Sequence, residues 1–337
     1  MSLARRDLGS SGIRVTPLGF GCATLFRASD PAQRSRLLRA AFDADIRHFD
    51  VAPMYGLGRA EPELGSFIRA HRSEVTIATK FGIRPTLVAR GLAYAQRPVR
   101  RTFESKPTIR DQARTHATLS SRLLYDKGGY DASGARRSLH RSLRALKTDY
   151  VDLLLLHDPL PGSVRSDEVS SFLEDARTAG LIRSWGISGA PENTGVVAQS
   201  FPQIPVLQLP DDIFVQSLRR APAGSAFITF GVIGRALARI VQHVRSDEST
   251  RSRWENSIGA DCGDPDVTSS FLLRAALKAN GYGVVLFGAT QLSHIRTAAS
   301  ALEKHLSPVS DKSDTGPFMS LVDTELCVPV AAEGRGI

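Results

Sequence analysis

Short apolar runs alternate regularly with longer amphipathic stretches along most of the chain. Eight of the runs are expected to be strands, at 18–23, 46–51, 75–80, 150–157, 182–188, 205–209, 226–230 and 283–288. Eight amphipathic stretches are expected to be helices, at 31–44, 59–71, 132–147, 166–179, 191–199, 211–219, 266–280 and 291–305. Alternation of this kind indicates parallel strands joined by crossover helices. Eight such units predict an α/β fold, a closed (β/α)8 TIM barrel.

The stretch 132–147 shows the helical pattern most clearly. Leu139, Leu143 and Leu146 recur at intervals of four and three residues, and arginines occupy the other faces. The run 150–157 that follows is almost continuously aliphatic, which is typical of a strand buried on both faces. Together they predict a strand in the barrel wall and a helix that covers the wall.

Several segments fall outside the alternation, although we expect residues 1–337 to form one barrel domain. Residues 8–17 predict an N-terminal hairpin, because Gly9, Ser10, Ser11 and Gly12 favour a turn. Residues 81–131 predict a long loop between the third strand and the third helix. Residues 243–265 are interpreted as an irregular polar stretch. The C-terminal tail, 306–337, is expected either to lie across the barrel mouth or to be mobile.

Composition excludes several classes of protein. Hydrophobic residues make up 42% and charged residues 23%, so the disordered and fibrous classes do not fit. No apolar run approaches the roughly 20 residues that span a bilayer, and we expect no membrane partner. The net charge of +9 is concentrated in 81–131, with ten Lys and Arg against four Asp and Glu. That segment lacks the aromatic pattern and the recognition helix of nucleic-acid binders, and we expect no nucleic-acid partner.

The cysteines bear on compartment and metal chemistry. Cys22, Cys262 and Cys327 are odd in number and far apart, so they indicate neither a disulfide framework nor a metal site. No His-x-x-Glu-His motif or paired cysteine motif is present either. We therefore expect a cytoplasmic protein without a metal ion.

Polar residues end many of the apolar strands. In a barrel of parallel strands these ends meet at one face, where active sites of this fold lie. The residues at or just after the strand ends are Asp50, Tyr55, Lys80, His157, Ser188 and Gln208. They predict one pocket at the mouth of the barrel.

Three motifs in this order resemble the aldo-keto reductase superfamily: Phe49-Asp50-Val51-Ala52-Pro53-Met54-Tyr55-Gly56, Ala78-Thr79-Lys80 and Asp152-Leu153-Leu154-Leu155-Leu156-His157. The resemblance implies a catalytic tetrad of Asp50, Tyr55, Lys80 and His157. It also implies a nicotinamide cofactor, NADP with NAD as the alternative, extended across the barrel mouth. The implied substrate is a small molecule: an aldehyde, a ketone or an open-chain sugar. The residues after Asp50 and the His-Asp-Pro at 157–159 look more like the sugar-dehydrogenase branch.

The tetrad also meets a chemical need. Carbonyl reduction adds a hydride at carbon and a proton at oxygen, and a tyrosine hydroxyl with a pKa near 10 is a weak proton donor. We expect Lys80 to lower the pKa of Tyr55, while Asp50 orients the lysine. His157 is expected to donate a hydrogen bond to the substrate oxygen. Each side chain alone has a structural interpretation, but their joint occurrence at strand ends favours catalysis.

By the same resemblance, six residues would contact the cofactor: Ser188 and Gln208 at the carboxamide, Phe230 on the ring, and Gly288, Thr290 and His294 near the phosphates. Five positions depart from the family pattern. Gly189 replaces an asparagine, Phe230 a tyrosine and His294 an arginine, and Thr297 and Ala298 replace a Glu-Asn pair. With His294 in place of arginine, a modest preference for NADPH is expected, increasing below about pH 6.5.

Three questions stay open at this stage, besides the oligomeric state. The enzyme could act in the oxidative direction, as an aldose dehydrogenase. The departures also allow a weakly active, cofactor-binding regulatory subunit. The basic segment 81–131 is either a flap, with Arg97, Arg100 and Arg101 closing over the pocket, or a surface insertion without a role.

Overall fold

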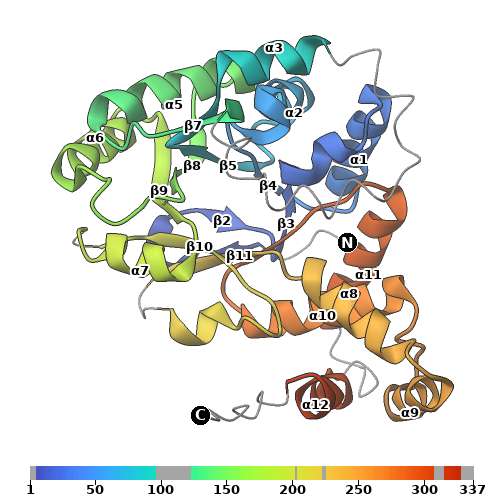
Figure 1. Ribbon diagram of the computed structural model, residues 1–337. Coiled ribbons are helices and arrows are strands. Elements are labelled where there is room, and N and C mark those ends of the chain that lie inside the picture. The colour runs from blue at the N-terminus through green and yellow to red at the C-terminus, as the bar shows by residue number, and fades with distance from the viewer. Residues whose placement is uncertain (1–4, 96–122, 202, 222–224, 307–314, 328–337) are drawn as a thin grey trace.

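A computed structural model of the chain contains a closed barrel of eight parallel strands, which confirms the predicted fold (Figure 1). The structure describes residues 5–95, 123–201, 203–221, 225–306 and 315–327. In order around the barrel the strands are β3 (Leu18–Gly21), β4 (His48–Asp50), β5 (Thr76–Phe81), β8 (Val151–His157), β9 (Ile182–Ser188), β10 (Val206–Pro210), β11 (Ala226–Phe230) and β12 (Val284–Phe287). Pairing of β12 with β3 closes the ring.

Helices surround the barrel as the alternation predicted (Figure 1). Those that match expected helices are α1 (Pro31–Asp43), α2 (Ala60–Ile68), α5 (Ala132–Leu146), α6 (Ser166–Thr178), α7 (Pro191–Ala198), α10 (Pro265–Ala279) and α11 (Leu292–Leu306). In α5, Leu139, Leu143 and Leu146 are buried, and the side chain of Asp131 caps the first turn by accepting from the Gly134 amide.

Alternation along β8 explains how the wall is packed on both faces. Leu153 and Leu155 lie in the cluster that fills the barrel interior. Leu154 and Leu156 lie in the larger cluster between the barrel and its helices. Successive strand residues point to opposite faces, so a strand inside an α/β barrel needs apolar residues at nearly every position.

The N-terminal hairpin is present and closes one end of the barrel. Strands β1 (Arg6–Asp7) and β2 (Arg14–Val15) pair antiparallel, with η1 (Gly9–Ser11) in the turn. Leu8, Ile13 and Val15 are fully buried in the interior cluster. Gly9 lies against Ala226, the first residue of β11. The hairpin therefore covers the amino ends of the strands, which leaves the carboxyl ends for a site.

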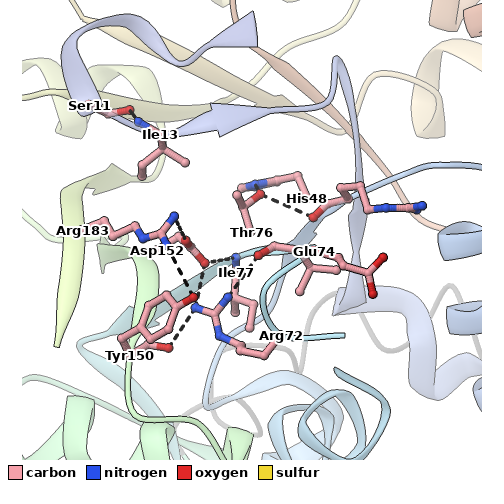
Figure 2. A network of polar contacts seen from close by, with 12 residues as sticks. Ser11, Ile13, His48, Arg72, Glu74, Thr76, Ile77, Tyr150, Asp152 and Arg183 are labelled. Carbon is pink, nitrogen blue, oxygen red and sulfur yellow. Dashed lines mark hydrogen bonds and ion pairs between the residues drawn. The ribbon is translucent and has the colours of Figure 1, made fainter. Parts of the chain in front are cut away.

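A buried carboxylate ties three strands together outside the barrel interior (Figure 2). Asp152, on β8, accepts from the backbone amide of Ile77 on β5 at 2.9 Å. It also pairs with Arg72 at 2.9 Å and with Arg183 of β9 at 3.1 Å. The guanidinium of Arg72 lies 3.8 Å from the ring centre of Tyr150. The motif residue Asp152 thus has a structural role in the barrel wall.

The helix expected at 211–219 is wrong. The structure has a single 3-10 turn there, η7 (Ser217–Arg220). The carboxylate of Asp212 accepts from the amides of Phe214 and Val215, which forms a local turn, and Gln216 has a left-handed φ of 48°. Asp side chains that bond nearby amides compete with helix formation, and a left-handed residue ends it.

The interpretation of 243–265 as irregular is also wrong, since α9 (Glu248–Ile258) lies within it and α8 (Gly234–Val244) ends at its start. Asp247 caps α9 and Gly259 ends it, while Trp254 is fully buried. Most other side chains of α9 are exposed, so the sequence has little hydrophobic periodicity there.

The last described element, α12 (Gly316–Glu325), packs on this helical layer. Phe318 contacts both Trp254 of α9 and Phe271 of α10.

The part of 81–131 that is described contains α3 (Leu87–Ala95) and an antiparallel ribbon of β6 (Ile83–Pro85) and β7 (Tyr125–Lys127), so its ends are regular where a loop was expected. No helix in the described parts of the chain is long and apolar enough to cross a bilayer.

Candidate active site

A cavity of about 530 Å³ opens at the carboxyl ends of the barrel strands. The parallel strands bring their last residues to this end. Asp50 ends β4, His157 ends β8 and Ser188 ends β9, and all three line the cavity. Tyr55 begins η3 (Tyr55–Gly58), the turn that follows β4, and lines the same cavity. The predicted convergence of strand ends is therefore what the structure contains.

The ammonium of Lys80 lies between a carboxylate and a phenol. Its Nζ is 2.6 and 2.8 Å from the two oxygens of Asp50 and 3.1 Å from the hydroxyl of Tyr55. The lysine side chain is 1% exposed. Because an ammonium can only donate, the Tyr55 oxygen accepts from Lys80, which leaves its own O–H free to donate elsewhere.

The charges of this trio move its pKa values. Burial lowers the pKa of Lys80, but the negative charge of Asp50 and the hydrogen bonds outweigh it, so the net shift is upward. Burial raises the pKa of Tyr55, and Lys80 opposes that rise without reversing it. Lys80 lowers the pKa of Tyr55 as expected, but burial and the charge of Asp50 outweigh it, so the net pKa lies above its usual value. Desolvation and the charge of Asp50 act in the opposite direction, and Tyr55 is protonated at neutral pH.

His157 stands beside Tyr55, with ring centres 6.0 Å apart and the rings nearly perpendicular. Burial holds the pKa of His157 well below its usual range, and the positive charges of Lys80 and Lys127 add to the effect. The imidazole is therefore neutral and carries one N–H donor. Its Nδ1 is buried and has no hydrogen-bond partner among the described residues. A ligand in the cavity can be met by two neutral donors, Tyr55 and His157.

A chain of hydrogen bonds extends from the trio to the next strands. Ser188 donates to Oε1 of Gln208 at 2.6 Å, and Gln208 donates to Asp50 at 2.8 Å. Both side chains are almost fully buried. Strands β9 and β10 thus fix the orientation of Asp50, while Ser188 and Gln208 also line the cavity.

Of the other residues assigned to the cofactor, Phe230, Gly288 and His294 line the cavity, and Thr290 is not among the lining residues. A Cβ at Gly288 would lie 2.4 Å from Oγ1 of Thr24, so glycine is needed to keep this wall open. That hydroxyl of Thr24 is buried without a partner in the described structure. The amide of Thr290 donates to Nδ1 of His294 at 3.5 Å.

The departure at Gly189 has a structural reason. A Cβ there would lie 3.1 Å from the Cα of Asp158 and about as close to the hydroxyl of Thr194. Asp158 has a left-handed φ of 50°, and its carboxylate pairs with Lys127 at 2.8 Å. The turn after β8 therefore crowds this position, and an asparagine there would require its neighbours to shift.

Among the lining residues that sequence reasoning missed are Thr24 and Arg27 of η2 (Cys22–Arg27) and Asp266 of α10. The rule that strand ends form the site could have found the first two, because η2 follows β3 directly. Asp266 begins a helix and has no comparable signal.

Arg97, Arg100 and Arg101, expected in a flap, lie outside the described residues. Within the described structure, no group of three or more His, Cys, Asp or Glu residues is arranged to hold a metal ion.

A family model described as the aldo/keto reductase family matches residues 17–200. D-threo-aldose 1-dehydrogenase of a Pseudomonas species is 32% identical over 194 residues, 56% of this chain and 54% of that protein. Pyridoxal 4-dehydrogenase of Microbacterium luteolum is 35% identical over 199 residues, 54% of each chain. The chain thus spans about half the length of the curated relatives it matches.

Solved structures share the fold along more of the chain. An aldo-keto reductase of Klebsiella pneumoniae in complex with NADPH aligns with a TM-score of 0.61 and 19% identity, covering 91% of this chain and 92% of that one. At this identity the likeness concerns the fold alone. The family-model match ends at residue 200, before Gln208 on β10, Phe230 on β11 and Gly288, which follows β12.

Proposed function

The chain belongs to the aldo/keto reductase family, and on that premise we propose that it is a nicotinamide-dependent oxidoreductase. It moves a hydride between the cofactor and the carbonyl or alcohol carbon of an aldehyde, a ketone or an open-chain sugar. The observation that carries the proposal is the buried Lys80 ammonium, held between Asp50 and the Tyr55 hydroxyl at the wall of a cavity that His157 also lines.

The residues present fit a nicotinamide dinucleotide, which supplies or accepts the hydride when it is bound. Phe230 offers an aromatic face to the cavity and Gly288 leaves an open cradle beside the unpaired Thr24 hydroxyl. Ser188 and Gln208 are side chains with the donors and acceptors that a carboxamide needs. Phe230 is expected to stack on the ring as tyrosine does in the family, since stacking needs the face and not the hydroxyl.

In the reductive direction, Tyr55 donates its proton to the substrate oxygen as hydride reaches the carbonyl carbon. Lys80 already donates to the Tyr55 oxygen, so its ammonium stabilises the tyrosinate that forms. The neutral His157 donates its N–H to the same substrate oxygen and orients the carbonyl. In the oxidative direction the tyrosinate accepts the alcohol proton, and Asp50 keeps Lys80 in place for both.

The names of the relatives support a polar aldehyde or an aldose as the substrate, because the two described above are an aldose dehydrogenase and a pyridoxal dehydrogenase. Aldose oxidation is the alternative direction of the same chemistry. We place the protein in the cytoplasm, because its three cysteines are free and two of them are buried.

The proposal is tested by steady-state assays with NADH, NADPH, NAD and NADP against a panel of aldoses, short aldehydes and ketones. We expect saturable turnover with at least one aldose or polar aldehyde, together with cofactor binding in a parallel fluorescence titration. Cofactor binding without turnover above background across the panel would instead favour the regulatory subunit. If the protein neither bound a cofactor nor turned over any substrate of the panel, both functions would be contradicted.

A further inference from the structure

The cavity beside Tyr55 extends to the first turns of two helices. At that end it is lined by Pro265, Asp266 and Ser269 of α10 and by His294 and Thr297 of α11. One continuous cavity thus joins the Tyr55 hydroxyl to the amino ends of α10 and α11. A dinucleotide whose reacting ring lies at Tyr55 has its adenosine at the other end of such a cavity.

A carboxylate lies at this second end. The Oγ1 hydroxyl of Thr297 donates to the carboxylate of Asp266 at 3.4 Å, so residues from both helices meet there. Arg27, on η2 after β3, is the one arginine or lysine among the described lining residues. The other lining carboxylate, Asp50, is neutralised by Lys80.

The two nicotinamide dinucleotides differ at the adenosine ribose. NAD has a 2′-hydroxyl there, for which a carboxylate is a good hydrogen-bond acceptor, and NADP has a 2′-phosphate, for which an arginine is the usual partner. A carboxylate beside a phosphate is a like-charge contact that opposes binding.

We propose that Asp266, supported by Thr297, reads the adenosine ribose and selects NAD over NADP. The inference rests on the proposed function, because it concerns which form of that cofactor the same cavity accepts. It departs from the modest NADPH preference expected from the sequence. That expectation was based on His294 alone, and Asp266 could not be placed beside it before α10 and α11 were seen together.

The inference is tested by calorimetric titration with ADP-ribose and 2′-phospho-ADP-ribose, which lack the nicotinamide, and with NADH and NADPH. The variants are Asp266→Asn, which removes the charge with little change of shape, and Asp266→Ser, which removes the charge and shortens the side chain. Glu303→Gln, an exposed carboxylate on α11 that does not line the cavity, is the matched control. Melting temperatures confirm that each variant is folded.

We expect the wild type to bind each probe without the 2′-phosphate about tenfold more tightly than its phosphorylated partner. Asp266→Asn and Asp266→Ser should reduce this ratio about fivefold or more, chiefly by tighter binding of the phosphorylated probe, and Glu303→Gln should leave it unchanged. A wild type that prefers the phosphorylated probes, or a ratio that neither Asp266 variant alters, would overturn the inference alone. Failure of all four probes to bind would overturn the proposed function as well.

Discussion

At the scale of single residues, the chemistry depends on how Lys80 divides its hydrogen bonds. It contacts both oxygens of Asp50, the carbonyl of Val51 and the hydroxyl of Tyr55. Burial alone would make both the ammonium and the tyrosinate unfavourable, so each stabilises the charged form of the other. The lysine therefore matters most when Tyr55 has lost its proton.

Replacing Lys80 with methionine removes that stabilisation and leaves Asp50 without its partner. Both changes raise the pKa of Tyr55, because the ammonium that lowers this pKa is lost and the Asp50 carboxylate that raises it stays. We expect lower activity and a residual oxidative rate whose rising limb shifts to higher pH. Lys304→Met, an exposed position on α11, is the control. An unchanged pH profile with substantial activity in Lys80→Met would contradict this coupling.

At the scale of elements, the segment from β7 to α5 supports the turn that carries His157. Tyr130, 4% exposed, donates to the backbone carbonyl of His157 at 2.6 Å. A Cβ at Gly82 would clash with the Tyr130 ring, so glycine is what lets this tyrosine approach β5. Lys127 holds the next residue, Asp158, through its ion pair. The long insertion after β5 is thereby connected to the histidine at the cavity.

Tyr130→Phe keeps the ring in place and removes the hydrogen bond to His157. We expect kcat/KM to fall about fivefold, the rate equivalent of the roughly 1 kcal/mol that one hydrogen bond contributes. Tyr125→Phe, on β7 of the same ribbon, is the matched control. Steady-state kinetics of the two variants decide the question, and equal kcat/KM values would mean that Tyr130 only packs.

The buried Asp152 pair acts on the same scale, because it joins β5, β8 and β9. Asp152→Asn leaves Arg72 with an uncompensated charge in a mostly buried position, and we expect a loss of roughly 2–3 kcal/mol in the free energy of unfolding. Asp126→Asn is the control, since its pair with Arg84 is exposed and should contribute about 0.5 kcal/mol or less. Denaturant titrations measure both, and similar losses would contradict the assignment.

At the scale of the whole molecule, acid stability depends on histidines inside the barrel. Burial lowers the pKa of His48 from 6.5 to about 4, and its Nδ1 is 2.9 Å from the hydroxyl of Thr76. Between these two values the unfolded chain binds a proton that the folded protein does not. Stability should therefore fall as pH falls from 6.5 towards 4.

The contribution of His48 to this loss should be roughly 3 kcal/mol by pH 4. His48→Asn removes the titrating ring while keeping a polar group near Thr76, so the dependence of unfolding free energy on pH should become shallower. His140→Asn, exposed on α5, should leave it unchanged. Urea titrations at pH 7 and pH 4.5 measure the free energy of unfolding at each pH. An equal loss of this free energy between the two pH values in wild type and His48→Asn would contradict the role of His48.

Features set by local sequence patterns could be predicted, and features set by contacts between distant segments could not. The barrel was predictable because buried parallel strands need continuous apolar runs, and Asp50, Lys80 and His157 because such strands end at one face. Helix 211–219 failed because the side chain of Asp212 bonds two nearby amides instead. The second end of the cavity could not be predicted, because Asp266 and Thr297 meet only through the packing of α10 against α11.

We propose that Tyr55 transfers the proton to and from the substrate oxygen, and Tyr55→Phe isolates this role. The variant keeps the ring and removes the hydroxyl, so turnover and cofactor affinity should separate. We expect kcat/KM to fall by about a hundredfold or more, while the dissociation constants for NADH and NADPH stay within about threefold of wild type. A variant whose kcat/KM stays within about tenfold of wild type would contradict proton transfer by Tyr55.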